Sequence, residues 1–175
     1  SGLSKLYPKS LSKEEIFNIA AMLGADVPFF LQDLSCSAGG IGEILEPVDF
    51  SRIFRDFILL VVPTFSMCSA DAYAEFDRHI KSKSGSVNYA DVLQDLNSIG
   101  EAKDLVTNDF EPVLFPHFPE LDQIKQTLYE FGAEYASLTG SGSVVYGMFL
   151  EEDSARKVEE KFKGSYRTKV IQPIS

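Results

Sequence analysis

The sequence predicts an α+β fold in which an antiparallel sheet carries helices on one face. The first indication is the run "DFILLVVP", Asp56 to Pro63, a continuous apolar stretch with the length of a strand buried on both faces. The second is a pair of strand-like runs, "EYASLTG" and "SVVYGMFL", close enough around a glycine loop to pair antiparallel. From Asp56 onward the order strand, helices, strand, strand, helix, strand makes an α+β sandwich the economical solution.

The first predicted helix covers "LSKEEIFNIAAMLG", residues 11–24. Ser12 is the expected N-cap, Glu15 closes a capping box with it, and Gly24 ends the helix. The apolar face of this helix consists of residues at helical spacing: Ile16, Ile19, Ala20 and Leu23.

Next comes "LGADVPFF", in which the residues around Asp26 are otherwise typical of a protein interior. Because burying a bare charge is costly, this carboxylate should be hydrogen-bonded, paired or held ready for chemistry. Taken alone, an aspartate at such a position is more often a turn or capping residue than a catalytic acid. The following "CSAGGIGEILEPV" predicts strand and bend, and its "AGGIGE" loop, residues 38–43, is either a bend or a surface that faces a ligand.

Four later segments show helical patterns, separated in one place by the polar linker "KSKSGS". The second of them is capped by Asn88, and the third has Leu121, Ile124 and Leu128 on one face and stops at Gly132. The four segments are "SADAYAEFDRH" from an N-cap at Ser69, "NYADVLQDLNS", "FPELDQIKQTLYEFGA" and "EDSARKVEEKFKG". A last strand is predicted in "SYRTKVIQPIS".

The loop "LTGSGSVVYG", Leu138 to Gly147, is the strongest candidate for anion binding. Closely spaced glycines let the main chain turn tightly and direct successive N–H groups at one anion. Val145 stands where a dinucleotide fingerprint needs its third glycine, and no Gly-x-Ser-x-Gly nucleophile elbow fits. A plain glycine hairpin between two strands also accounts for the spacing.

Composition narrows the function classes. A formal net charge of −10 argues against a nucleic-acid surface, but main-chain N–H groups can still hold a phosphorylated ligand. No apolar run is long enough to span a bilayer, and the opening "SGLSKLYPKS" lacks the apolar core of a signal peptide, so a cytoplasmic protein is expected. Cys36 and Cys68 form no CxxC pair, and His79 and His117 are far apart, so no zinc spacing is visible and no metal site is expected.

Three stretches then follow one another: "LGADVPFFL", "AGGIGEILEPV" and "TNDFEPVLFPHFPELDQIKQTLYEFGAEYASLTGSGSVVYGMF". With them the chain resembles the 4-diphosphocytidyl-2-C-methyl-D-erythritol kinase family of the GHMP superfamily (galactokinase, homoserine kinase, mevalonate kinase and phosphomevalonate kinase). The resemblance runs from Leu11 to Phe149, and "GADVP" and "TGSGS" are its signature stretches. It implies a GHMP-kinase-like fold, with a ferredoxin-like α/β sandwich as C-terminal domain over residues 56–175 and the remainder of the N-terminal domain over residues 1–55.

The resemblance also implies a reaction: transfer of the γ-phosphoryl group of ATP, with Mg²⁺, to the 2-hydroxyl of the methylerythritol moiety in non-mevalonate isoprenoid biosynthesis. Asp26 matches the family's catalytic aspartate, which takes or orients the proton of that hydroxyl. Ile41 and Tyr73 fall where the family lines its cytidine pocket. Four residues match the glycine motif beside the bound phosphates: Gly140, Ser141, Gly142 and Ser143.

The chain departs from the family in lacking its "GLGGGSS"-type ATP loop and the N-terminal strand with a catalytic lysine. We therefore expect sequence before Ser1, exposed apolar residues in the first 55 positions, and no phosphoryl transfer by residues 1–175 alone. The expected partner is a small cytidine diphosphate-linked substrate, with no nucleic acid and no membrane, in the cytoplasm or a plastid-like compartment. Two alternatives stay open: another GHMP kinase of the homoserine or mevalonate type, and a non-catalytic metabolite-binding module.

Overall fold

The computed structural model describes residues 11–32, 35–40, 42, 44–49, 53, 57–79 and 89–173. The chain divides into two compact units, residues 1–50 and 51–175, and each is described by itself. This division falls close to the sequence-based boundary between residues 55 and 56. Within the described residues, no helix combines the length and the apolar composition needed to cross a membrane.

The first unit contains helix α2 (Lys13–Leu23), the short 3₁₀ helix η1 (Val27–Leu31) and a hairpin of β1 (Cys36–Gly39) with β2 (Ile44–Pro47). Helix α2 has the predicted capping box. The main-chain N–H of Glu15 donates to the Ser12 hydroxyl, and the Glu15 carboxylate accepts from the Ser12 N–H at 2.7 Å. The predicted ends of α2 and the predicted strand-and-bend region are both confirmed.

Several large apolar side chains of the first unit face solvent. Leu23 is 75% exposed and Phe30 79% exposed, and Ile19 is also exposed, as expected for the first 55 residues. Asp26, the residue before η1, is exposed as well. The expectation that its segment is interior is therefore wrong, because the described elements of this unit bury Pro28 but leave its neighbours uncovered.

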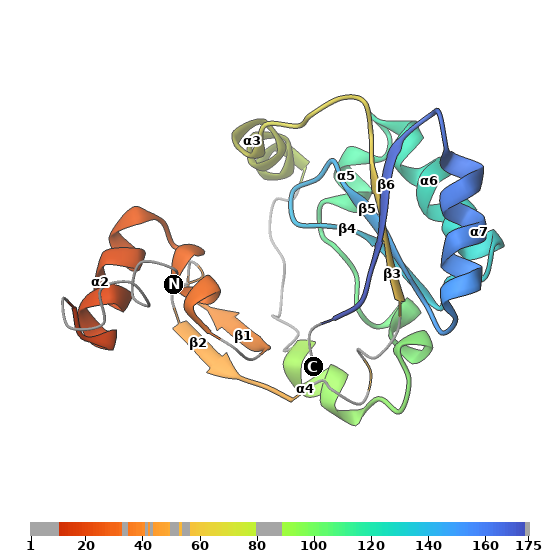
Figure 1. The fold of residues 1–175 in the computed structure, drawn as a ribbon. Helices are drawn as coiled ribbons and strands as arrows, with labels where there is room; N and C mark the ends of the chain where they lie inside the picture. The colour runs from red at the N-terminus through yellow and green to blue at the C-terminus, as the bar shows by residue number, and fades with distance from the viewer. Residues whose placement is uncertain are drawn as a thin grey trace. The chain divides into compact units, whose positions relative to one another are not determined.

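The second unit is built on a four-stranded antiparallel sheet with the strand order β4-β5-β3-β6 (Figure 1). Strand β3 (Phe57–Val62) lies in its centre, between β5 (Val145–Phe149) and β6 (Arg167–Ile171). Strand β4 (Tyr135–Leu138) forms one edge and pairs with β5 across the glycine loop. The predicted α+β fold and the antiparallel pairing around this loop are confirmed.

Helices α6 (Pro119–Glu130) and α7 (Glu152–Phe162) pack side by side on one face of this sheet (Figure 1). Helix α3 (Ser69–His79) packs against α5 (Glu111–Leu114), and α4 (Tyr89–Asp95) and η2 (Ile99–Asp104) lie between them along the chain. Each predicted helix is present, although α3 begins at Ser69 itself instead of after it, and α5 was not predicted. The cap assigned to Asn88 lies outside the described residues.

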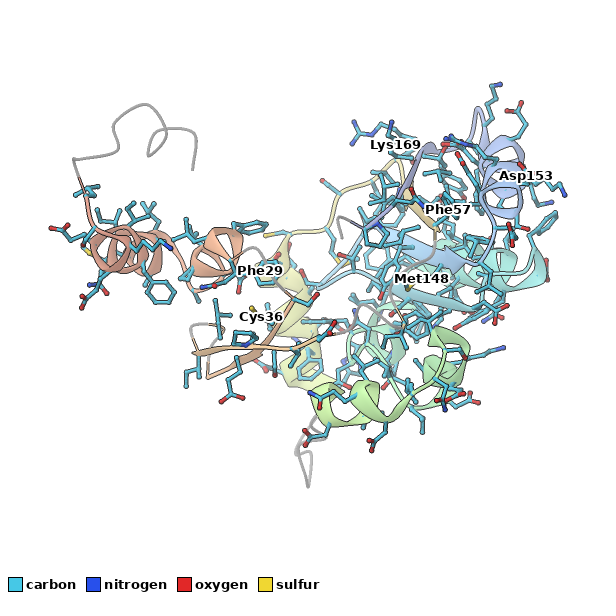
Figure 2. The ribbon with its side chains drawn as sticks, turned by 60° about the horizontal axis from the view of Figure 1, so that its bottom comes forward. Phe29, Cys36, Phe57, Met148, Asp153 and Lys169 are labelled. Carbon is cyan, nitrogen blue, oxygen red and sulfur yellow. The ribbon has the colours of Figure 1, made fainter. Side chains whose placement is uncertain are left out.

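The core lies between the sheet and α6 and α7. Leu59 and Val61 on β3 are fully buried there, as are the three residues predicted for the apolar face of α6. The prediction that β3 is buried on both faces is wrong in part, since its alternate residues are only partly buried. Figure 2 shows Met148 of β5 inside the second unit, whereas Asp153 on α7 and Lys169 on β6 lie at its periphery.

A buried carboxylate joins α5, α6 and the edge strand. Glu111 is 7% exposed, and its Oε1 accepts hydrogen bonds from the main-chain N–H of Leu138 at 2.8 Å and the hydroxyl of Ser137 at 3.1 Å. Its Oε2 pairs with the ammonium group of Lys125 at 2.6 Å. One side chain thus satisfies a main-chain donor on the open edge of β4 and neutralises a largely buried cation.

We expect Glu111→Ala to lower the free energy of unfolding of the second unit by about 3–5 kcal/mol, because it leaves Lys125 and the Leu138 N–H without their partner. Glu111→Gln should cost less, since its amide oxygen can still accept from Leu138. Urea denaturation followed by circular dichroism measures both. The control is Glu160→Ala, which removes an exposed ion pair with Lys163 and should change stability little. Equal midpoints for the Glu111→Ala and Glu160→Ala variants would contradict this role.

Candidate functional site

The glycine loop between β4 and β5 is a tight turn that depends on left-handed glycines. Gly140 has a φ of 52° and Gly142 a φ of 92°, values that residues with a Cβ rarely adopt. The N–H of Thr139 donates to the carbonyl of Val144 at 2.9 Å, and the N–H of Gly142 donates to the carbonyl of Thr139 at 3.0 Å. These bonds close the loop on itself and leave its tip on the surface of the second unit.

Asn108 holds one side of the loop. Its Nδ2 donates to the carbonyl of Leu138 at 2.7 Å and to that of Gly140 at 2.8 Å. Its Oδ1 accepts from the N–H of Phe110 at 2.9 Å, which fixes the orientation of the amide. A single side chain therefore sets the position of the first glycine relative to the segment that leads into α5.

The two serines of the loop hold its other side. The hydroxyl of Ser143 is buried and donates to the carbonyl of Phe65 at 2.9 Å. The hydroxyl of Ser141 lies 2.9 Å from that of Ser69, the first residue of α3. Because both hydroxyls are engaged within the protein, the capacity of the loop to bind an anion rests mainly on its main chain and on the adjacent N-terminus of α3.

A cavity of about 380 Å³ opens beside the loop. Residues 106–110 line one wall, and Gly140 with side chains of β4 and β5 lines the other. Two of these are tyrosines: the hydroxyl of Tyr135 donates to the carbonyl of Val106 at 3.0 Å, and burial raises the pKa of both Tyr135 and Tyr146. Both phenols are neutral at physiological pH, and Tyr135 uses its one hydroxyl proton in the bond to Val106.

Asp26 belongs to the first unit, where it meets the second glycine-rich stretch. A Cβ placed on Gly42, whose φ is 116°, would lie 2.8 Å from Oδ1 of Asp26. Only a glycine at this position lets the main chain approach the carboxylate so closely. The structure thus brings "GADVP" and "AGGIGE" together, whereas Ile41 of the same loop lies outside the described residues.

Tyr73 lies on α3, in the second unit. Its ring is 58% exposed and contacts the ring of Phe110 edge-on, with centroids 5.0 Å apart. Phe110 also lines the cavity beside the glycine loop. Tyr73 therefore exposes part of its ring next to that cavity, which a residue that contacts a nucleotide base must do.

Three features of the second unit escaped the sequence analysis. The first two are Asn108 and Glu111, which the sequence analysis quoted only inside the stretch "TNDFEPVLF". Their spacing of three residues, next to an apolar segment, indicates that both side chains can point to the same side of the chain. The third feature concerns metal ligands: Glu75, His79 and His117 gather their ligand atoms within 4.8 Å of one another. The two histidines are far apart in sequence, but their rings lie close together because α3 packs against α5.

Residues 90–168 match the family model described as GHMP kinases C terminal. A 4-diphosphocytidyl-2-C-methyl-D-erythritol kinase of Chlorobium chlorochromatii is 37% identical over 171 residues, covering 96% of this chain and 58% of its own length. A protein of the same name from Leptospira biflexa is 35% identical over 158 residues, covering 86% of this chain and 51% of its own length. The chain thus spans between half and three-fifths of the length of these curated relatives.

Solved structures give the same result. The crystal structure of a 4-(cytidine 5'-diphospho)-2C-methyl-D-erythritol kinase superposes with a TM-score of 0.79 at 25% identity, covering 97% of this chain and 59% of its own. A homoserine kinase from Cytophaga hutchinsonii reaches 0.61 at 15% identity, covering 98% of this chain and 61% of its own, which shows a shared fold alone. Residues 90–168 of the second unit thus match the GHMP kinase C-terminal model, and the chain as a whole is similar to the corresponding part of the 4-diphosphocytidyl-2-C-methyl-D-erythritol kinases.

Proposed function

We propose that the full-length gene product transfers the γ-phosphoryl group of ATP to the 2-hydroxyl of 4-diphosphocytidyl-2-C-methyl-D-erythritol. The observation that carries this proposal is the 37% identity to a kinase of that name across 96% of the chain. Homoserine and mevalonate kinases resemble this chain at only 15–17% identity, in fold alone, so homoserine and mevalonate are not the favoured substrates.

On the acceptor side, Asp26 is the proposed base. Its carboxylate is exposed and lies against the main chain of Gly42, and it does not cap the helix that it precedes. An exposed carboxylate that caps no helix can accept or orient the proton of a substrate hydroxyl. Phosphoryl transfer depends mostly on positioning and charge stabilisation, so such a base contributes to the rate without forming a covalent intermediate.

On the donor side, the glycine loop is the proposed phosphate contact. The main chain of the loop and the N-terminus of α3 would present N–H groups without a basic side chain, while the N–H of Gly142 is already bonded to the carbonyl of Thr139. ATP would bring Mg²⁺, which is held chiefly by phosphate oxygens and water in kinase sites and neutralises the charge that develops during transfer. The loop residues of this chain bind and orient the phosphates in this proposal.

For the cytidine part of the substrate we propose contacts from Tyr73 and Ile41. Tyr73 has an exposed ring face suited to stacking on a base, and Ile41 would add an apolar contact. The first unit is proposed to be part of the N-terminal kinase domain, and the protein is proposed to act in the cytoplasm, or in a plastid-like compartment, on a small molecule and not on nucleic acid or a membrane.

The first test concerns Asp26. In the full-length gene product, Asp26→Asn keeps the shape of the side chain but cannot accept a proton, so kcat should fall by roughly 10²–10⁴-fold. The KM for ATP should change little. A coupled assay of ADP release with the cytidyl substrate measures both values. Turnover within a few-fold of wild type would remove Asp26 from the mechanism.

The second test concerns Gly140. A Cβ at this position meets no described protein atom within 4 Å, so a functional effect of Gly140→Ala must arise from a ligand or from the left-handed main chain. Gly164 offers a matched control, since it has a φ of 85° and the same open surroundings after α7. Each alanine should cost about 1–2 kcal/mol of stability through its left-handed conformation. Only Gly140→Ala should raise the KM for ATP. The expected increase is about tenfold or more, which corresponds to the loss of one hydrogen bond to a charged group. Equal KM values for the two variants would show that the loop is a plain hairpin.

A further inference from the structure

Three metal-ligating side chains converge on one surface of the second unit, and none of them has a role in the proposed reaction. Glu75 and His79 lie one turn apart on α3 and so face the same side of this helix. His117 comes from the loop between α5 and α6, where its N–H donates to the carbonyl of Leu114 at 3.0 Å. The two histidine side chains are 51% exposed and Glu75 is 22% exposed, so an ion from solvent can reach all three.

The spacing of the three groups suits a metal better than direct hydrogen bonds. Oε1 of Glu75 lies 3.2 Å from Nε2 of His117 and 3.4 Å from Nδ1 of His79. Charged N–H···O contacts are usually shorter, about 2.7–2.9 Å. Ligands about 2.0–2.1 Å from a tetrahedral Zn²⁺ are separated by about 3.4 Å. Two of the ligand separations are therefore close to those of a zinc site, and all three ligand atoms lie within 4.8 Å of one another.

A neighbouring contact orients the carboxylate. Arg78 pairs with Oε2 of Glu75 at 2.6 Å, which leaves Oε1 turned toward the histidines. Partners that fix a ligating carboxylate in this way support many protein metal sites. Nδ1 of His79 lies 2.9 Å from the carbonyl of Glu75, so the metal-free ring carries its proton on Nδ1. Metal binding through Nδ1 replaces this hydrogen bond, and the proton then sits on Nε2.

We propose that Glu75, His79 and His117 form a binding site for a divalent transition-metal ion, with Zn²⁺ as the fitting occupant. Two imidazoles and one carboxylate are a ligand set that zinc uses, with a water molecule in the fourth position. Mg²⁺ and Ca²⁺ prefer all-oxygen ligands and do not suit two imidazoles.

The ion would link two segments that are far apart in the sequence. Helix α3 ends in this cluster, and its first residue, Ser69, contacts the glycine loop. The other segment is the turn that precedes α6, where Phe118 stacks on Phe65 with ring centroids 5.3 Å apart. An ion bound to both segments binds the folded state alone, so it should raise the unfolding temperature of the second unit.

Metal-free chain 1–175 is titrated with ZnCl₂ by calorimetry, and thermal unfolding is followed with and without the ion. We expect one Zn²⁺ per chain and a higher unfolding temperature. Glu75→Gln, His79→Ala and His117→Ala should each weaken binding by at least about tenfold. The matched control is Asp77→Asn, on the same turn of α3 but two residues from Glu75 and therefore on another side of the helix, and it should bind like wild type.

The chain contains only His79 and His117, so nuclear magnetic resonance of the imidazoles gives a direct second readout. Both ring signals should shift together as one equivalent of Zn²⁺ is added. Co²⁺ in place of Zn²⁺ shows whether a thiolate such as that of Cys68 binds, through its charge-transfer absorption. Absence of binding, unchanged affinity in the His117→Ala variant, or a cobalt–thiolate band with unshifted imidazoles would each overturn the proposal.

Discussion

The open edge of β4 is the constraint around which the second unit is arranged. An edge strand presents main-chain donors and acceptors that must find partners, and three side chains supply them here. Glu111 accepts from the N–H of Leu138, Asn108 donates to its carbonyl, and Tyr129 donates to the carbonyl of Ala136 at 3.2 Å. Because Glu111 also binds Lys125 on α6, satisfying this edge fixes the strand, the helix that covers it and the loop that follows.

The contacts that satisfy this edge also fix the geometry of the glycine loop. Asn108 bonds the last residue of β4 and the first glycine of the loop with one amide group. Ser141 and Ser143 attach the loop to α3 and to the segment after β3. A loop made flexible by glycines is therefore held at four points. Preorganisation of this kind lowers the cost of ordering the loop when a ligand binds.

The sequence predicted the local features well, because they depend on short-range chemistry. The capping box of Ser12, the buried face of α6 and the antiparallel strands around "GSG" each follow from periodicity or from a few adjacent residues. Features that depend on tertiary distance were missed. Nothing in the local pattern links Asn108 to a loop 30 residues later, or His79 to His117, and a strand predicted to be buried on both faces proved to be covered fully on one.

The scarcity of basic residues in the sequence around the glycine loop limits how the candidate site could bind an anion. The chain has 26 acidic and 16 basic residues, and no Lys or Arg occurs between Lys125 and Arg156, the stretch that contains the glycine loop. Lys125 itself is occupied by Glu111 at 2.6 Å. In the proposed role of the loop, this stretch would contact a triphosphate through main-chain dipoles and the cation that the ligand brings, and not through basic side chains of its own. Left-handed glycines and a helix N-terminus suit that role, since dipoles attract an anion without raising the charge of the free protein.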